Sequence, residues 1–339
     1  MDKIIIPMSY MGSGSSAVTD LLREYEGINT KNSDFEYVFL YAPDGLFDLE
    51  YKLLYNNNAI RSDEAIKSFR KLMKELYIYG GWGIANYKEK ISQNFINIVD
   101  SYLNSIVTSK YHGIWYYHQK PTKVDWIIRV IKRVLFKKTT KLKQLQLEMS
   151  MVSSEDFYEK SRKFIVDVIK QISDTEENIV LDQLLLPHNL NLIDNYKIDG
   201  LLPIIVSRDP RDVFIMNKYF WKPRNQEVPY PTDVKTFCNY YKMMRQNEKK
   251  TDTLTLRLNF EDLVLHYEET KDKIENFIGI DAIHHKEKFR YFNPNISVNN
   301  LQVYNRDVNY LPEVEIIESE LSEYLYNFKN DIISNGDVF

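Results

Sequence analysis

The feature that most constrains the fold of this chain is an apolar run at residues 3–8 that ends in a cluster of glycine and serine. After this cluster, apolar residues return at helical spacing: Ala17, Val18, Leu21 and Leu22. A short apolar run predicts a buried strand, and apolar residues three and four positions apart predict a helix. The segment is therefore expected to form a strand, a tight loop and a helix in succession.

Three later apolar runs are typical of buried parallel strands, namely 179–181, 202–206 and 254–258. Residues 36–41 are a fifth candidate, because they are rich in aromatic and β-branched side chains and a turn follows them. Strands that alternate with helical segments predict an α/β, P-loop-like fold of three layers, in which helices flank a central parallel sheet.

The chain of 339 residues is expected to form one domain, 1–339, with a largely helical insertion at 51–174 and a last amphipathic helix at 312–328.

A formal net charge of −4 argues against a nucleic-acid-binding protein. A single cysteine, Cys238, excludes an internal disulfide and a cysteine metal cluster. Because we recognise neither a signal peptide nor a membrane span, we expect a cytoplasmic protein.

The glycine and serine cluster has the composition of an anion-binding loop. Its residues are Gly12, Ser13, Gly14, Ser15, Ser16 and Ala17. Glycine lets the backbone fold closely around an anion, while amides and the helix dipole supply positive potential. A structural turn with a serine helix cap is the alternative. The loop lacks the Lys-Ser/Thr ending of ordinary ATP and GTP hydrolases, which disfavours that class.

A second candidate for anion binding follows the run at 202–206, where the sequence reads Arg208-Asp-Pro-Arg-Asp-Val. An arginine at the carboxyl end of a parallel strand stands where such sheets bind ligands. Its planar guanidinium can donate two parallel hydrogen bonds to one phosphate group. A network of arginine and aspartate on the surface is the alternative.

Four segments, in this order, resemble motifs of the sulfotransferase superfamily, whose enzymes use 3′-phosphoadenosine 5′-phosphosulfate. They are 12–16, 208–213, 258–264 with 274–280, and 292–300. The resemblance implies that the amides of 12–16 and the hydroxyls of Ser15 and Ser16 bind the 5′-phosphosulfate. It further implies that Arg208 binds the 3′-phosphate and that Phe260 lies against the adenine. Arg306 is another candidate for the 3′-phosphate, unless it is simply solvated.

The chain departs from the family pattern at three functional positions. Gly12 stands where relatives have a lysine or arginine, so the chain must find that cation elsewhere. Met216 stands in place of a serine, for which the neighbouring Asn217 could substitute as donor. Leu185 occupies the position of the histidine base of cytosolic members.

Two residues are candidates for the general base that sulfuryl transfer requires. Glu36 matches the position of the glutamate that carbohydrate-directed relatives use, although it could instead mark a surface strand. His188, after Pro187, is the second choice because an imidazole titrates near neutral pH. The alternative for His188 is a structural role, in which the imidazole only makes hydrogen bonds within its own loop.

The insertion contains two segments that could serve an acceptor or a membrane. Residues 111–118 are rich in aromatic side chains with polar tips, which suits either stacking on sugars or core packing. Residues 126–143 form a basic amphipathic stretch without an acidic residue. It could rest on an anionic membrane at the inner face, which would suit a lipid-linked acceptor, or it could cover the core.

The sequence thus predicts a sulfotransferase that needs no metal. Its donor would be 3′-phosphoadenosine 5′-phosphosulfate and its product 3′-phosphoadenosine 5′-phosphate. The acceptor would be a hydroxyl or amine of a small molecule or glycan, with a carbohydrate or glycan precursor expected. Two alternatives stay open. One is a kinase using ATP and magnesium, for which Asp182 after 179–181 would bind the metal. The other is an inactive nucleotide-binding scaffold. The oligomeric state is left open as well.

Overall fold

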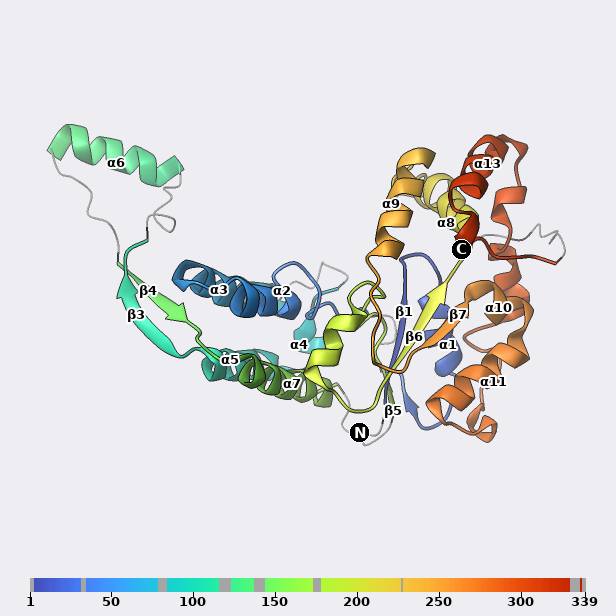
Figure 1. Cartoon of the computed structure of the whole chain (residues 1–339), viewed down its shortest axis with the longest axis horizontal. Helices are drawn as coiled ribbons and strands as arrows, with labels where there is room; N and C mark the ends of the chain where they lie inside the picture. The colour runs from blue at the N-terminus through green and yellow to red at the C-terminus, as the bar shows by residue number, and fades with distance from the viewer. Residues whose placement is uncertain are drawn as a thin grey trace.

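Five parallel strands form the centre of the computed structural model, which describes residues 3–31, 35–78, 84–115, 123–136, 144–172, 178–226, 228–329 and 336. In spatial order the strands are β2 (Ile28–Asn29), β5 (Asn178–Val180), β1 (Ile4–Ser9), β6 (Leu201–Ser207) and β7 (Leu256–Asn259). β1 therefore lies in the middle of the sheet. Its residue Ile4 pairs with Ile179 of β5 on one side and with Leu201 of β6 on the other. Figure 1 shows this sheet between two layers of helices.

The alternation of side chains along β1 explains the layers, because successive residues of a strand point to opposite faces. All six residues of β1 are buried. Ile5 packs in a cluster with α1 (Ser15–Leu22), α10 (Phe260–Leu265) and α11 (Tyr267–Ile278). Ile4 and Ile6 pack on the other face with the helices of the insertion. The insertion therefore shares a hydrophobic core with the sheet.

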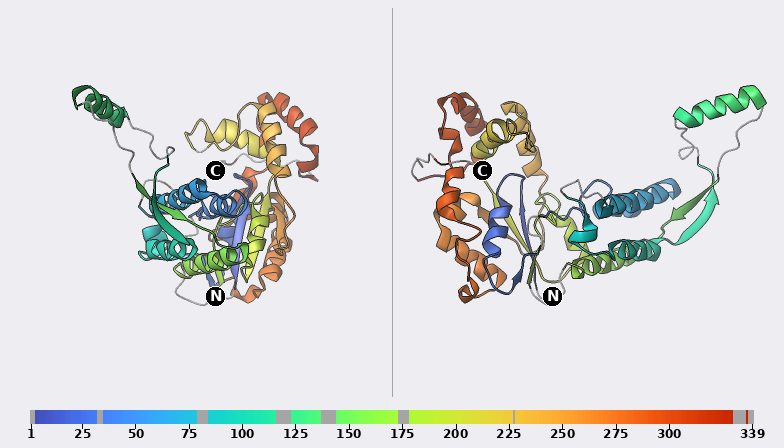
Figure 2. Two further views of the ribbon diagram at one scale, coloured as in Figure 1. Left: turned by 60° about the vertical axis from the view of Figure 1, so that its left-hand side comes forward. Right: turned by 180° about the vertical axis from the view of Figure 1, so that it is seen from behind.

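The insertion lies on one side of the sheet in the views of Figures 1 and 2. From β2 to β5 the chain forms α2 (Leu46–Glu50), a π-helical segment (Tyr51–Tyr55), α3 (Ala59–Ile78), α4 (Tyr87–Lys90), α5 (Phe95–Ile106), β3 (Ser109–Gly113), α6 (Lys123–Phe136), β4 (Leu145–Met149) and α7 (Ser154–Lys170). β3 and β4 pair antiparallel, so the insertion holds a hairpin as well as the expected helices.

The elements after β5 complete the fold. These are α8 (Pro210–Ile215), a second π-helical segment (Met216–Trp221), α9 (Val234–Gln246), α12 (Pro294–Ser297), α13 (Leu311–Glu320), and 3₁₀ turns at Leu190–Tyr196, Ala282–His284, Val298–Asn300, Val303–Asn305, Val308–Tyr310 and Ser322–Tyr324. Within the described ranges, we find no helix whose length and hydropathy would let it cross a bilayer.

Two sequence expectations for secondary structure are wrong. Residues 36–41 form no strand, and the edge strand is instead β2. The four residues 37–40 are all buried, and Ala42 N donates to Val38 O, so the segment is a buried turn rather than an alternating strand. The final helix ends at Glu320 and does not reach residue 328, because the chain continues as a 3₁₀ turn and then extended backbone.

Candidate functional site

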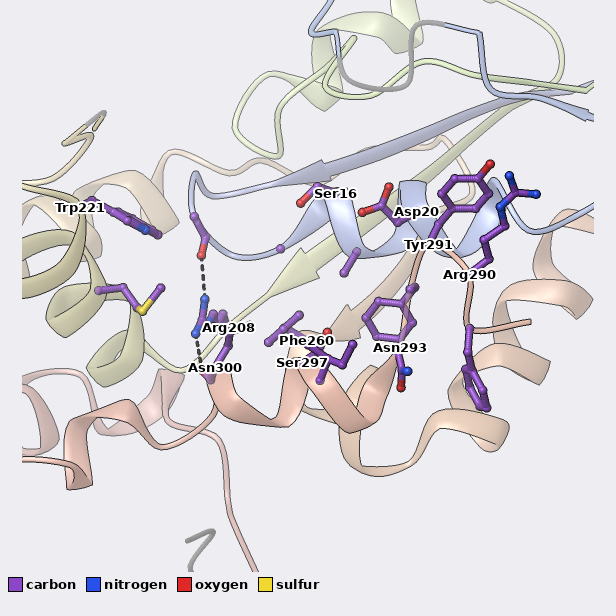
Figure 3. A pocket seen from close by; sticks show the side chains of 17 residues that line it. Ser16, Asp20, Arg208, Trp221, Phe260, Arg290, Tyr291, Asn293, Ser297 and Asn300 are labelled. Atoms are coloured by element: carbon purple, nitrogen blue, oxygen red, sulfur yellow. Dashed lines mark hydrogen bonds between the residues drawn. The ribbon is translucent and has the colours of Figure 1, made fainter. Parts of the chain in front are cut away.

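The loop between β1 and α1 folds back on itself through a series of left-handed residues. Met11, Gly12 and Gly14 have φ angles of +49°, +69° and +94°, and Gly14 is the N-cap of α1. This geometry turns the start of α1 toward the space at the carboxyl end of the sheet (Figure 3). Ser13 is fully buried, and its hydroxyl has no hydrogen-bond partner among the described residues.

Aromatic rings cover both glycines of this loop, which explains why neither position carries a side chain. A Cβ added at Gly12 would lie 2.5 Å from Cη2 of Trp221, and one added at Gly14 would lie 2.7 Å from Cδ2 of Phe260. The Trp221 ring therefore occupies the space into which the family's loop lysine or arginine would begin to extend.

Arg208 follows β6 and is 6% exposed. It donates to the carbonyl oxygens of Asn300 and, at 3.5 Å, of Gly12 (dashed in Figure 3). The guanidinium lies 5.0 Å from the ring centre of Phe260. Its Nε is buried and has no partner in the described part of the chain. Arg208, Phe260 and the glycine loop thus form one packed unit.

This unit forms one side of a cleft of about 430 Å³. The cleft is lined by Gly12, Gly14, Ser16, Ala17, Asp20, Arg208, Met216, Trp221, Phe260, Asn300 and residues of the segment 289–297. In Figure 3, Trp221 and Arg208 lie at one end, and Arg290 and Tyr291 lie at the other. The cleft is therefore long, with cations at both ends and Phe260 between them.

Buried carboxyls tie Arg208 to the C-terminal segment. Glu261 accepts a hydrogen bond from the amide of Asp209, and burial raises the pKa of Glu261 to about 8. Asp212 accepts from the amides of Gln302 and Tyr304, and burial raises its pKa to about 7. These bonds link the start of α8 to α10 and to the chain after Asn300, which fixes the segments on either side of the Arg208 guanidinium.

A second pocket of about 300 Å³ adjoins the cleft. Its lining is Met11, Gly12, Glu36, Gln183, Trp221, Gln226 and Pro229. Because Gly12 and Trp221 line both spaces, they form a shared wall. The structure thus brings Glu36 beside the anion-binding loop, although Glu36 belongs to a distant turn.

Glu36 is oriented by a neighbour at the end of β5. Gln183 Nε2 donates to Glu36 Oε1 at 2.7 Å. The preceding residue, Asp182, is 7% exposed, and Oδ1 has no hydrogen-bond partner in the described ranges. Burial, followed by the charge of Glu36, raises the pKa of Asp182 to about 7. The same carboxylates add to the effect of burial in raising the pKa of the Tyr41 hydroxyl.

Several residues predicted for the site lie outside both spaces. Ser13 and Ser15 are buried and line neither space, and Ser15 Oγ accepts from Ser9 Oγ at 3.3 Å. Asn217 bonds in both directions to the backbone of Tyr230, so it holds a neighbouring loop. Arg306 donates to the carbonyls of Asn299 and Gly336 and does not line the cleft.

The remaining candidates are also separate from the cleft. His188 is exposed on the loop after β5 and lines neither space, and Leu185 is fully buried. Of the aromatic segment 111–118, residues 116–118 lie outside the described ranges. The rest lies in and just after β3, at the end of the insertion away from the sheet in Figure 1.

Several lining residues were not predicted from the sequence, among them Arg290, Tyr291, Gln183 and Trp221. Gln183 stands at the carboxyl end of β5, a position that general rules for parallel sheets mark as ligand-facing. Trp221 ends the second π-helical segment, and its place over Gly12 depends on that irregular turn, for which the sequence holds no signal. Across the described ranges, no three His, Cys, Asp or Glu side chains gather in a group that could hold a metal ion.

No family model and no curated protein matches this sequence. Among solved structures, a sulfotransferase domain from the curacin biosynthetic pathway is similar at 11% identity and a TM-score of 0.39, covering 95% of this chain and 98% of that one. A sulfotransferase from Mycobacterium tuberculosis is similar at 11% identity and 0.37, covering 95% and 76%. Retinol dehydratase, solved with androsterone and the inactive cofactor PAP, is similar at 12% identity and 0.32, covering 97% and 82%. Two of these three structures are named as sulfotransferases.

Proposed function

We propose that this chain is a sulfotransferase that moves a sulfuryl group from 3′-phosphoadenosine 5′-phosphosulfate to a hydroxyl or amine of an acceptor. The observation that carries the proposal is the packed unit of Arg208, Phe260 and the glycine loop at the carboxyl edge of a parallel sheet. Such an edge is where open α/β sheets bind nucleotides.

The donor set fits a nucleotide that carries phosphate at two positions. Arg208 lines the cleft, and its buried Nε lacks a partner among the described residues. An unpaired buried donor costs about 1–3 kcal/mol, and a bound anion can supply the missing acceptor. The helix start at Gly14 adds amide donors for a second anionic group. Between the two lies the Phe260 ring, a surface on which a base can pack.

We assign the roles as follows. The amides around Gly12 and Gly14, with the Ser16 hydroxyl, would hold the 5′-phosphosulfate, and Arg208 would hold the 3′-phosphate. When bound, the donor supplies an activated sulfuryl group, and 3′-phosphoadenosine 5′-phosphate is the product. Trp221 lines both spaces, so its ring would lie beside the transferring group.

Glu36 is our candidate for the general base. It lies in the pocket next to Gly12, where an acceptor hydroxyl would approach the transferring group. Gln183 holds one carboxylate oxygen, which leaves the carboxylate oriented to take the hydroxyl proton as the new oxygen–sulfur bond forms. His188 is not adjacent to either space, so we place it second.

The second pocket favours a carbohydrate or glycan precursor as acceptor. Two amides, Gln183 and Gln226, and the carboxylate of Glu36 line it together with the indole of Trp221. Amides and carboxylates bond sugar hydroxyls, while an aromatic ring packs on the apolar face of a sugar. We place the reaction in the cytoplasm, where the buried thiol of Cys238 stays reduced.

Calorimetric titration of the wild-type protein with 3′-phosphoadenosine 5′-phosphate, ADP and ATP, each with and without magnesium, tests the proposal. We expect magnesium-independent preference for the 3′-phosphorylated nucleotide. Magnesium-dependent ATP binding would instead support the kinase alternative, and binding of none of the three nucleotides would support a scaffold without a nucleotide site.

The matched variants are Arg208→Ala and Arg162→Ala. Arg162 also donates to a backbone carbonyl, that of Tyr196, but it lies on α7. A charged hydrogen bond contributes about 1.5–3 kcal/mol, so Arg208→Ala should weaken binding of the 3′-phosphorylated nucleotide by roughly 10-fold to 200-fold. Arg162→Ala should leave it unchanged. Equal losses in both variants would mean that Arg208 acts only through the fold.

A further inference from the structure

The helix α6 (Lys123–Phe136) presents apolar side chains that nothing in the described part of the chain covers. Eight of them are between 39% and 70% exposed: Val124, Trp126, Ile127, Ile128, Val130, Ile131, Val134 and Leu135. In Figures 1 and 2 the helix stands apart from the rest of the fold. The alternative interpretation of this segment from the sequence, a helix that covers the core, therefore does not hold.

Eight of the nine apolar residues of α6 occupy one face of the helix, and the exception is Phe136 at its last position. At 100° per residue, the arc from Trp126 through Val134 to Ile128 spans about 200°. Arg129, Lys132 and Arg133 fall on the remaining arc, together with Asp125 and Phe136, while Lys123 at the first position falls within the apolar arc. This segregation is typical of a helix that lies at a boundary between an apolar medium and water.

The positive charge of α6 and of the residues that follow it, 137–143, favours a negatively charged partner. Residues 123–143 hold eight lysines and arginines and one acidic residue, Asp125, which gives a formal charge of +7 in a chain whose total is −4. Trp126 lies next to Arg133 around the helix, at the border between the apolar and basic arcs. Tryptophan and basic residues are enriched at this level of a bilayer, where headgroups meet acyl chains.

We propose that α6 binds the surface of an anionic lipid bilayer, with its apolar arc in the headgroup boundary and its cations toward lipid phosphates. The apolar arc supplies burial, and the basic arc supplies attraction to a negative surface. The proposal does not depend on the sulfotransferase assignment, because no residue of α6 lines the cleft or the second pocket.

Co-sedimentation of the full-length protein with lipid vesicles tests this inference. One set contains phosphatidylcholine alone, and the other contains phosphatidylcholine mixed with phosphatidylglycerol. We expect binding to the mixed vesicles that is at least about tenfold stronger and that weakens as salt is raised. Equal binding to both sets, or binding to neither, would overturn the proposal.

Three variants assign the binding to α6. Ile127→Asp with Ile131→Asp alters the apolar arc, and Arg129→Glu with Lys132→Glu reverses the basic arc. Each pair should lower binding to the mixed vesicles by at least about tenfold. Leu254→Asp alters a side chain that is 71% exposed outside α6, and it should bind as the wild type does.

Two readouts separate lipid binding from other effects. The thermal unfolding midpoints of all variants should match the wild type, because the substituted side chains are exposed or, for Arg129, half-buried. Sedimentation velocity without lipid should give one species for the wild type and for Ile127→Asp with Ile131→Asp. If the wild type instead self-associates and this variant does not, the apolar arc pairs with a second copy of the chain and the membrane proposal is wrong.

Discussion

At the scale of single residues, Glu36 carries the chemical prediction. Glu36→Gln keeps a side chain that can bond Gln183 but removes the proton acceptor. We expect turnover, measured as acceptor-dependent release of 3′-phosphoadenosine 5′-phosphate, to fall by about 10²-fold to 10⁴-fold. Nucleotide affinity should not change. The exposed Glu26→Gln is the control, and an unchanged rate in Glu36→Gln would move the base to another residue.

Asp182 gives a prediction for stability against pH. The pKa of this carboxyl is raised from 3.8 to about 7, mainly by burial and then by the charge of Glu36. The folded chain therefore binds the proton more tightly than the unfolded chain, so Asp182 lowers the free energy of unfolding as pH rises from about 4 to 7. Each pKa unit corresponds to about 1.4 kcal/mol, which sets an upper limit near 4 kcal/mol.

Asp182→Asn should remove this loss. In urea denaturation, the variant should exceed the wild type in free energy of unfolding at pH 8, by up to about 4 kcal/mol, and should approach the wild type near pH 4. Asp233→Asn, at an exposed helix cap, should not show this pattern. A difference for Asp182→Asn that is the same at both pH values would contradict the assignment of the proton to Asp182.

At the scale of elements, the loop between β1 and α1 and the π-helical segment after α8 depend on each other. Gly12 and Gly27 both have positive φ, at +69° and +84°, but a Cβ at Gly27 would meet nothing within 4 Å. Gly27→Ala should therefore cost only the backbone strain of about 1–2 kcal/mol. Gly12→Ala should cost more, because its Cβ also collides with Trp221.

Thermal unfolding and nucleotide titration of the two variants check this prediction. The double variant with Gly12→Ala and Trp221→Ala should recover the part of the stability that Gly12→Ala loses through the collision, and it should keep only the backbone strain at position 12. If the double variant only adds the two separate losses, then Trp221 does not limit the side chain at position 12.

The sequence predicted the elements whose pattern is local. Four apolar runs became β1, β5, β6 and β7, and the glycine loop and Arg208 came together at the sheet edge as strand order implies. Strand β2 was not predicted because two residues carry no periodicity. The turn at 36–41 was predicted as a strand because it is rich in aromatic and β-branched side chains. These side chains are buried against the helices of the insertion and not against the two faces of a sheet. Trp221 was missed because its place depends on a π-helical turn.

At the scale of the whole molecule, α6 and its connections should be dispensable for folding. The antiparallel pairing of β3 and β4 ends at Gly113 and Leu145, so a short glycine and serine linker can replace residues 116–143. Because α6 side chains are exposed, we expect the free energy of unfolding to change by less than about 0.5 kcal/mol. Nucleotide binding should be retained, and a large loss of stability would mean that α6 packs on the fold.

The position of β1 also determines when the sheet can form during synthesis. β1 is the first strand to leave the ribosome, yet its two neighbours, β5 and β6, begin at Asn178 and Leu201. At 5–20 residues per second, the apolar strand waits unpaired for roughly 10 to 35 seconds. A nascent chain that ends before β5 therefore exposes Ile4, Ile5 and Ile6 to chaperones, and protection of β1 from proteolysis should appear only once β6 has emerged.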